Sequence, residues 1–264
     1  MRRTLAIARK EIEVYFTTPI AYVVLMLVAF LSSLVFNGAL DAYRYLALRA
    51  LTFQAPDAMD ALNLTDFVVA RVYVWVAIFV LAASPFLSMR LFSEEKRTRT
   101  FELLLTAPVR PIQIVLGKYA ASLVALGAAL AVAALYPLLL ARYAEGAAGG
   151  AAVEWQTVGT ALLGIFLLGA MSLSVGMFAS SLTESMVVAA LVSLFLLVGL
   201  TLVPMLAVVS EGPLRDLALA LSPVQHLGPF LSGRIELKGL VYFLSFAGLG
   251  VYLSDRAVEG HRWI

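Results

Sequence analysis

Long segments without a charged residue place the strongest constraint on this chain. Residues 20–36, 119–141 and 186–209 contain no Asp, Glu, Lys or Arg. A helix needs about 20 consecutive apolar residues to cross a bilayer. The whole chain is 62% hydrophobic and 14% charged, whereas soluble domains are about 45–50% apolar and about 25% charged. The sequence therefore predicts an all-α polytopic membrane protein.

The hydrophobic pattern predicts a single transmembrane domain, 1–264, with six spans. The expected boundaries are about 19–37, 67–91, 115–141, 157–181, 186–209 and 238–254. Before the first span, Leu5, Ala8, Ile12 and Tyr15 recur at helical spacing among charged residues, which is typical of an amphipathic helix at a membrane surface. We expect residues 41–66 to form an external loop with a short helix, and residues 210–237 to form an outer amphipathic segment.

A polar island at residues 89–118 separates the second and third spans and holds the densest charge in the sequence. We expect residues 92–114 to form a loop that contains one short helix. If the island and both termini share one side of the membrane, that side holds twelve of the 19 basic residues. Cytoplasmic loops are enriched in Lys and Arg, so this distribution predicts that the island and both termini are cytoplasmic.

The short helix expected in the island has two distinct faces. Phe101, Leu104 and Leu105 share one face beside Glu102, and Pro108 ends the turn. A helix that is charged at its start and apolar on one side fits a groove on a soluble partner. An ordinary solvated loop is the alternative interpretation.

Several classes of site are excluded or disfavoured. The chain has no cysteine, which excludes disulfides, and its two histidines are too few for a zinc cluster. Gly117-Lys118 is followed by Tyr119 rather than Ser or Thr, so the chain lacks a phosphate-binding loop. No carboxylate in the middle of a span suggests a proton relay. We therefore expect no enzyme activity, no catalytic residue, no metal or cofactor site in this chain, and no binding of nucleic acid.

Two stripes of small residues predict close helix packing. Gly117, Ala121, Ala125, Ala129 and Ala133 recur every four residues in the third span. Ser172, Gly176 and Ser180 have the same spacing in the fourth. Small residues at this spacing let another helix approach closely.

Three stretches carry a resemblance to a known family. They are EEKRTRTFELLLTAPV at 94–109, KEIEVYFTTPIAY at 10–22 and LSPVQH at 221–226. The first resembles the coupling loop of permeases of the type-2 exporter (ABC-2-type) superfamily of ABC transporters, and more narrowly of the gliding-motility permease branch. One position departs from the family pattern, because a Gly usually precedes Thr100 and this chain has Arg99.

The resemblance implies a permease subunit in the bacterial inner membrane that couples ATP hydrolysis to export of an unidentified substrate. It implies a separate ABC ATP-binding subunit that holds ATP and Mg, and a second permease copy or paralogue that completes a dimer. The gliding-motility branch also implies a companion membrane protein with a large external domain. The contact with the ATP-binding subunit would lie at Glu94, Glu95, Lys96, Arg97, Thr100, Phe101, Glu102, Leu105 and Glu184.

Two other functions stay open at this point. The first is a membrane scaffold or mechanical transducer that uses the same ATPase coupling to move a partner instead of its own cargo. The second is a secondary transporter, which is disfavoured because the sequence shows neither an inverted repeat nor ionisable residues within the spans.

Overall fold

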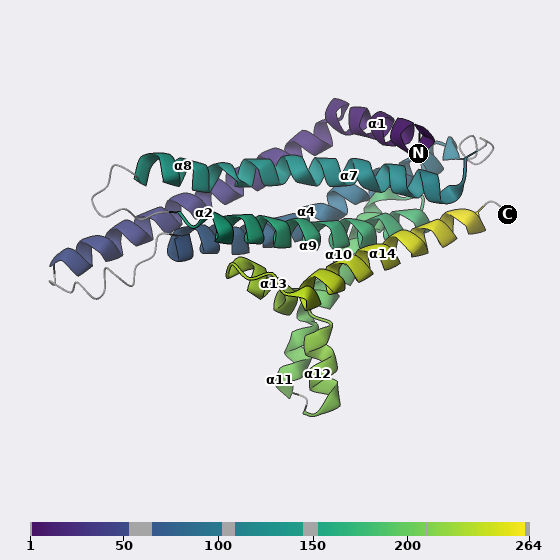
Figure 1. Ribbon diagram of the computed structural model, residues 1–264. Helices are drawn as coiled ribbons and strands as arrows, with labels where there is room; N and C mark the ends of the chain where they lie inside the picture. Colours follow the sequence, from purple (N-terminus) through teal and green to yellow (C-terminus); the bar gives the residue numbers. More distant parts are fainter. Residues whose placement is uncertain (1, 53–64, 102–108, 145–152, 210, 262–264) are drawn as a thin grey trace.

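The computed structural model describes residues 2–52, 65–101, 109–144, 153–209 and 211–261, and this part of the chain is helical without a β-strand (Figure 1). The helices in chain order are α1 (Arg2–Thr17), α2 (Pro19–Thr52), the π-helix η1 (Thr65–Val69), α4 (Ala70–Ser88), α5 (Arg90–Arg97), α7 (Pro111–Ala133), α8 (Leu135–Ala144), α9 (Trp155–Leu182), α10 (Met186–Leu202), the 3-10 helix η2 (Val203–Met205), α11 (Leu206–Val209), α12 (Pro213–Ala220), α13 (Pro223–Leu231) and α14 (Leu237–Gly260).

Six segments in the described ranges are long and apolar enough to cross a membrane, which confirms the predicted all-α fold with six such helices. They are Ala21–Arg49, Phe67–Arg97, Pro111–Arg142, Trp155–Leu182, Met186–Met205 and Leu237–Gly260.

The first long helix extends well beyond the expected end of the first span. Residues 41–66 were expected to form an external loop with a short helix, but α2 continues to Thr52. Residues 53–64 lie outside the described residues. No Pro or Gly interrupts the chain between Gly38 and Pro56, and Leu, Ala and Arg are strong helix formers. Asp41 and Arg44, one turn apart, form an ion pair with a 3.7 Å separation. Helix propensity therefore favours the continuation of α2 through this segment.

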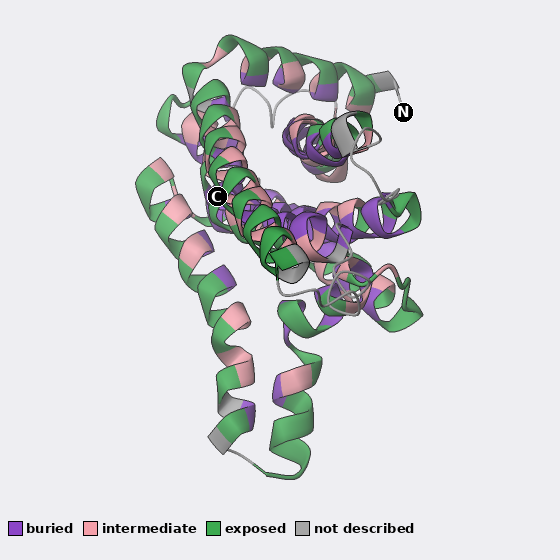
Figure 2. Ribbon diagram, turned by 90° about the vertical axis from the view of Figure 1, so that its left-hand side faces the viewer, coloured by how far each residue is buried: buried purple, intermediate pink, exposed green. Residues whose placement is uncertain are grey.

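Helix α9 lies at the centre of the fold. It packs against α14, α4, α10, α13, α7 and α5, and Figure 2 shows the buried residues gathered in the middle of the bundle. Its predicted small-residue stripe is buried. A Cβ on Gly176 would come 1.9 Å from Ser88 Oγ and 2.9 Å from Ser193 Oγ. The absence of a side chain at Gly176 therefore lets α4 and α10 meet α9 at one point.

Helix α1 packs against α7 at Gly117, the first residue of the other small-residue stripe. A Cβ on Gly117 would lie 2.8 Å from Ile7 Cγ2 and 3.1 Å from the Thr4 carbonyl oxygen. The Tyr15 hydroxyl is buried and donates a 2.6 Å hydrogen bond to the Leu87 carbonyl oxygen of α4, and burial raises the pKa of this phenol. Leu5, expected on the apolar face of an amphipathic helix at the membrane surface, is exposed. The packed face of α1 carries Glu11 instead.

Helices α11 and α12 project from the bundle (Figure 1), and α10 to α12 are mostly exposed (Figure 2). Helices α11 and α12 belong to the connection between the fifth and sixth candidate spans. Helix α13 returns to the bundle and packs against α9 and α14. This connection precedes the N-terminus of α14, whereas α5 reaches the C-terminal end of α14 through the contact of Lys96 with His261. The connection therefore lies away from α5.

Candidate functional site

Helix α5 follows α4 with only Met89 between them, so the expected loop at 92–114 begins as a helix. Ser180, near the end of α9, holds this junction in place. Its Oγ accepts hydrogen bonds of 3.1 Å from the backbone N–H groups of Phe92 and Ser93, and donates a 2.8 Å bond to the Met89 carbonyl oxygen. These bonds attach the base of α5 rigidly to the central helix.

A buried ion cluster joins α5 to two further helices. Lys118 Nζ of α7 lies 2.9 Å from Glu95 Oε1 of α5 and 3.1 Å from Glu11 Oε1 of α1. The Lys118 side chain is only 2% exposed, and the two carboxylates are 14% and 10% exposed. Lys10, 60% exposed, lies 3.7 Å from both carboxylates. Two acids and one buried ammonium group therefore connect three helices that are distant in sequence.

Lys96 makes a second connection, to the ends of α9 and α14. Its Nζ donates to the Ser181 carbonyl oxygen and lies 2.9 Å from His261 Nε2. His261 Nδ1 lies 2.8 Å from the Ala257 carbonyl oxygen, so Nδ1 carries the proton and Nε2 accepts from Lys96. The Phe101 ring lies edge-on between the rings of Phe92 and His261, with centroids 6.2 Å from each. This connection packs the turn after α5 against the end of the last helix.

The C-terminus of α5 has an unusual residue in a Schellman motif. The Thr100 N–H donates a 3.0 Å bond to the Glu95 carbonyl oxygen, and the Arg99 N–H a 3.1 Å bond to the Lys96 carbonyl oxygen. The motif requires a left-handed residue after the cap, a position that usually holds Gly. Here it is Arg99, with φ of 57°. Arg99, where the family usually has Gly, therefore carries a side chain at a left-handed position that favours glycine.

Replacing Arg99 with Gly is expected to stabilise the end of α5 by about 1 kcal/mol, because the left-handed conformation costs a non-glycine residue about 1–2 kcal/mol. Hydrogen exchange of the peptide that covers residues 95–101 should slow, and the melting temperature in detergent should rise. Thr98→Gly is the matched control, since Thr98 lies in the same turn with φ of −85°, and it should lower stability. Equal exchange in wild type and Arg99→Gly would contradict the assignment of strain.

The sequence-predicted contact residues divide into three groups in the structure. Glu95, Lys96 and Phe101 point into the protein and hold α5 to its neighbours. Glu94 is half-buried and pairs with Arg90 at 3.0 Å. Arg97, Thr100 and Glu184 are exposed. Glu102 and Leu105, with most of the short helix expected at 100–106, lie outside the described residues.

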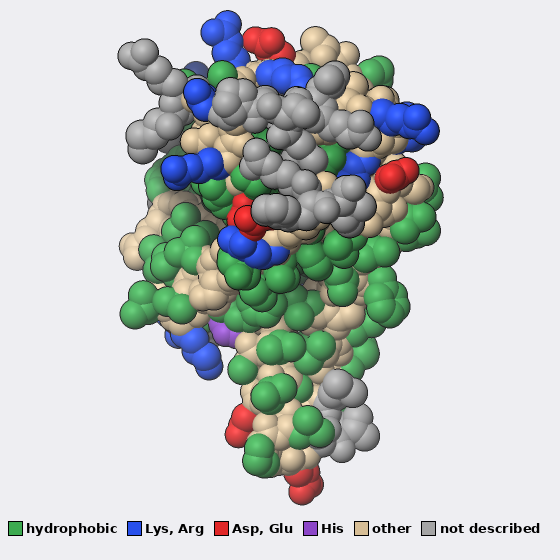
Figure 3. All heavy atoms as spheres, turned by 90° about the vertical axis from the view of Figure 1, so that its right-hand side faces the viewer, with side chains coloured by type: hydrophobic (Ala, Val, Ile, Leu, Met, Phe, Trp, Pro, Cys, Tyr) green, Lys and Arg blue, Asp and Glu red, His purple; other side chains and the backbone are tan. Residues whose placement is uncertain are grey.

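The three exposed residues belong to one region. Glu184 follows the end of α9 and interacts electrostatically with the Lys96 ammonium group, and Lys96 precedes Arg97 in the last turn of α5. Figure 3 views this end of the molecule, where basic side chains gather above a largely hydrophobic surface. We call the exposed surface formed by Arg97, Thr100 and Glu184 the α5 end.

Sequence reasoning missed the residues that anchor α5. Lys118 and Glu11 were visible as charges at the edge of the island and in the N-terminal helix, but no spacing rule joins residues 107 positions apart. Ser180 was assigned only to a packing stripe, and His261 was considered only as a possible zinc ligand. The sequence signal that could have identified these anchors is a charged residue on an otherwise apolar helical face.

The comparisons with known proteins now decide the family. The family model described as ABC-2 family transporter protein matches residues 43–242, which is about three quarters of the chain. The chain belongs to the ABC-2 transporter family. It is thus a membrane permease component of an ABC transporter, a non-catalytic subunit that pairs with an ABC ATP-binding subunit. A search of curated proteins finds no match for this permease.

Proposed function

We propose that this permease is an exporter subunit and that the ATP-binding subunit docks on the α5 end. One observation supports this docking site above all others. Arg97 and Thr100 at the end of α5 are exposed. Glu95 and Lys96 in the same last turn, together with Ser180 at the base of the helix, bind α5 to α1, α7, α9 and α14. A surface that meets a moving partner needs both properties, because force applied at the exposed end then reaches several spans.

In this proposal, closure of the ATP-binding subunits displaces α5 and the helices attached to it together. Packed helices change position as units instead of deforming continuously. The Lys118 cluster moves α1 and α7, and the Lys96 connection moves the ends of α9 and α14. The permease would alternate between two arrangements of its spans and release its substrate on the far side.

The remaining parts of the assembly are proposals that rest on the family resemblance. We place the permease in the bacterial inner membrane with both termini and the α5 end in the cytoplasm, as the distribution of basic residues predicts. It would act as a dimer with a second copy or a paralogue. Membership of the gliding-motility branch would add a companion membrane protein with a large external domain.

The experiment starts with purification of the full-length permease from its host in mild detergent, followed by mass spectrometry of the proteins that accompany it. We expect a soluble ATP-binding subunit in roughly equal amount. With that subunit co-expressed, Arg97→Glu should reduce its recovery and the ATPase activity of the complex by about tenfold or more, the size of effect seen at central interface residues.

Arg215→Glu is the matched control, because Arg215 is an exposed arginine on α12, far from α5. It should leave recovery and ATPase activity unchanged. Loss of the ATP-binding subunit to the same extent in both variants, or in neither, would overturn the docking site. The family assignment does not depend on this result.

A further inference from the structure

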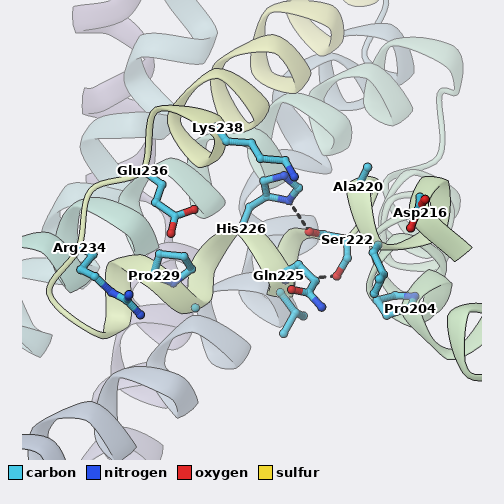
Figure 4. A pocket seen from close by; sticks show the side chains of 13 residues that line it. Pro204, Asp216, Ala220, Ser222, Gln225, His226, Pro229, Arg234, Glu236 and Lys238 are labelled. Carbon is cyan, nitrogen blue, oxygen red and sulfur yellow. Dashed lines mark hydrogen bonds between the residues drawn. The ribbon is translucent and has the colours of Figure 1, made fainter.

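An open hollow of about 910 Å³ lies beside the connection between the fifth and sixth candidate spans (Figure 4). Residues from α12, α13 and the beginning of α14 line it, together with Pro204 of η2. It lies at the ends of these spans remote from α5. The hollow is therefore separate from the proposed docking site, and any ligand there reaches the permease from the other membrane surface or the adjoining leaflet.

His226 forms a fixed polar wall of the hollow. Its ring is buried and stacks on Tyr242, with centroids 4.1 Å apart and planes within 4°. Its Nδ1 lies 2.8 Å from the Ser222 carbonyl oxygen, so Nδ1 carries the proton and Nε2 is left as an acceptor. The Tyr242 hydroxyl in turn donates a 2.7 Å bond to the Leu221 carbonyl oxygen. The imidazole is thus held in one orientation and one tautomer.

Charges of both signs surround this wall. Arg234, Glu236 and Lys238 precede or begin α14 and line the hollow. Figure 4 shows Lys238 beside the His226 ring, and Arg234 and Glu236 together on one side near Pro229. Within the described ranges none of the three forms an ion pair, whereas other exposed charges, such as Arg9 and Glu13, do pair. Asp216 of α12 also lines the hollow. Two cations and two carboxylates are therefore available to a ligand there.

Part of the lining of the hollow is apolar and could contact a hydrocarbon chain. Pro204 and Leu219 contribute to it, and Val224 is 59% exposed. A ligand that fits must combine an anionic group, a hydrogen-bonding cation and an adjacent apolar part.

We propose that this hollow binds the phosphoethanolamine headgroup of a phospholipid. The phosphate would accept hydrogen bonds from the Arg234 guanidinium and the Lys238 ammonium group, which are the usual partners of phosphate in proteins. The primary ammonium group would donate to the Glu236 carboxylate and to His226 Nε2. A choline headgroup has no N–H to donate, so the site distinguishes phosphoethanolamine from phosphocholine by hydrogen bonding.

The test uses the full-length permease, delipidated in detergent, with dihexanoyl lipids as probes and native mass spectrometry as the measurement. Wild type should bind dihexanoyl-phosphatidylethanolamine about tenfold more tightly than the phosphatidylcholine analogue, because hydrogen bonds between charged groups are among the strong ones. The double variant Arg234→Gln/Lys238→Gln should lose about tenfold or more in affinity for phosphatidylethanolamine. Glu236→Gln should remove the preference over phosphatidylcholine.

Arg215→Gln is the control, since Arg215 is exposed on α12 but does not line the hollow, and its lipid binding should equal that of wild type. Equal binding by wild type and the double variant, or no preference for phosphatidylethanolamine, would overturn the proposal. If free phosphoethanolamine competes as well as the short-chain lipid does, the site takes a soluble headgroup and the lipid assignment fails. None of these measurements needs the ATP-binding subunit, so their outcome is independent of the docking proposal.

Discussion

Replacing Lys118 with methionine is expected to release α1 from the permease and to lower its stability by about 3–5 kcal/mol, the cost of removing one partner from a buried ion pair. The variant leaves the Glu11 and Glu95 carboxylates buried close together without their shared ammonium group. Lys10 offers little compensation, because it is 60% exposed and 3.7 Å from either acid.

The absence of native cysteine makes this release measurable. A cysteine placed at buried Ala8 of α1 should react slowly with a maleimide in the wild-type background. In Lys118→Met the reaction should be about tenfold faster or more, in line with the loss of stability. The melting temperature in detergent should fall in parallel.

Lys10→Gln is the matched control, since exposed ion pairs contribute only about 0–1 kcal/mol, and it should change labelling little. Adding Glu95→Gln to Lys118→Met removes one uncompensated charge and should restore part of the protection. Wild-type labelling and melting in Lys118→Met would contradict the structural role of the cluster.

Replacing Gly176 with leucine is expected to prevent the permease from forming a monodisperse species in detergent. The position has no room for a side chain, because even a Cβ would lie 2.8 Å from Ser88 Cβ and 1.9 Å from Ser88 Oγ. Relief requires α4 or α10 to move away from the central helix. Overpacking a core by a few methylenes already costs about 1–3 kcal/mol. At Gly176 the clash includes the Ser88 Cβ, which cannot move without the α4 backbone.

Gly159→Leu is the control in the same helix, since a Cβ there meets no atom within 4 Å. It should give a monodisperse permease, with a melting temperature at or above that of wild type, because leucine favours a helix more than glycine does. The milder Gly176→Ala should fold with a lower melting temperature. If Gly176→Leu and Gly159→Leu behave alike in gel filtration and melting, the close contact at Gly176 is wrong.

The sequence by itself determined the class of protein and most of its helices. Apolar segments of about 20 residues usually cross a bilayer as α-helices, because an α-helix pairs every backbone N–H and C=O within the segment. Helix boundaries were less accessible. The extension of α2 through Asp41 and Arg44 was missed because polar residues of good helix propensity resemble a loop in a hydropathy pattern.

Only the tertiary structure decided which charges of the polar island face inward. Glu95, Lys96 and Arg97 are adjacent in sequence and equally polar, yet two of them are held inside the protein and one is exposed. The difference depends on Glu11, Lys118, Ser181 and His261, which come from four other parts of the chain. A buried charge needs a partner in space, and no local pattern in the sequence specifies that partner.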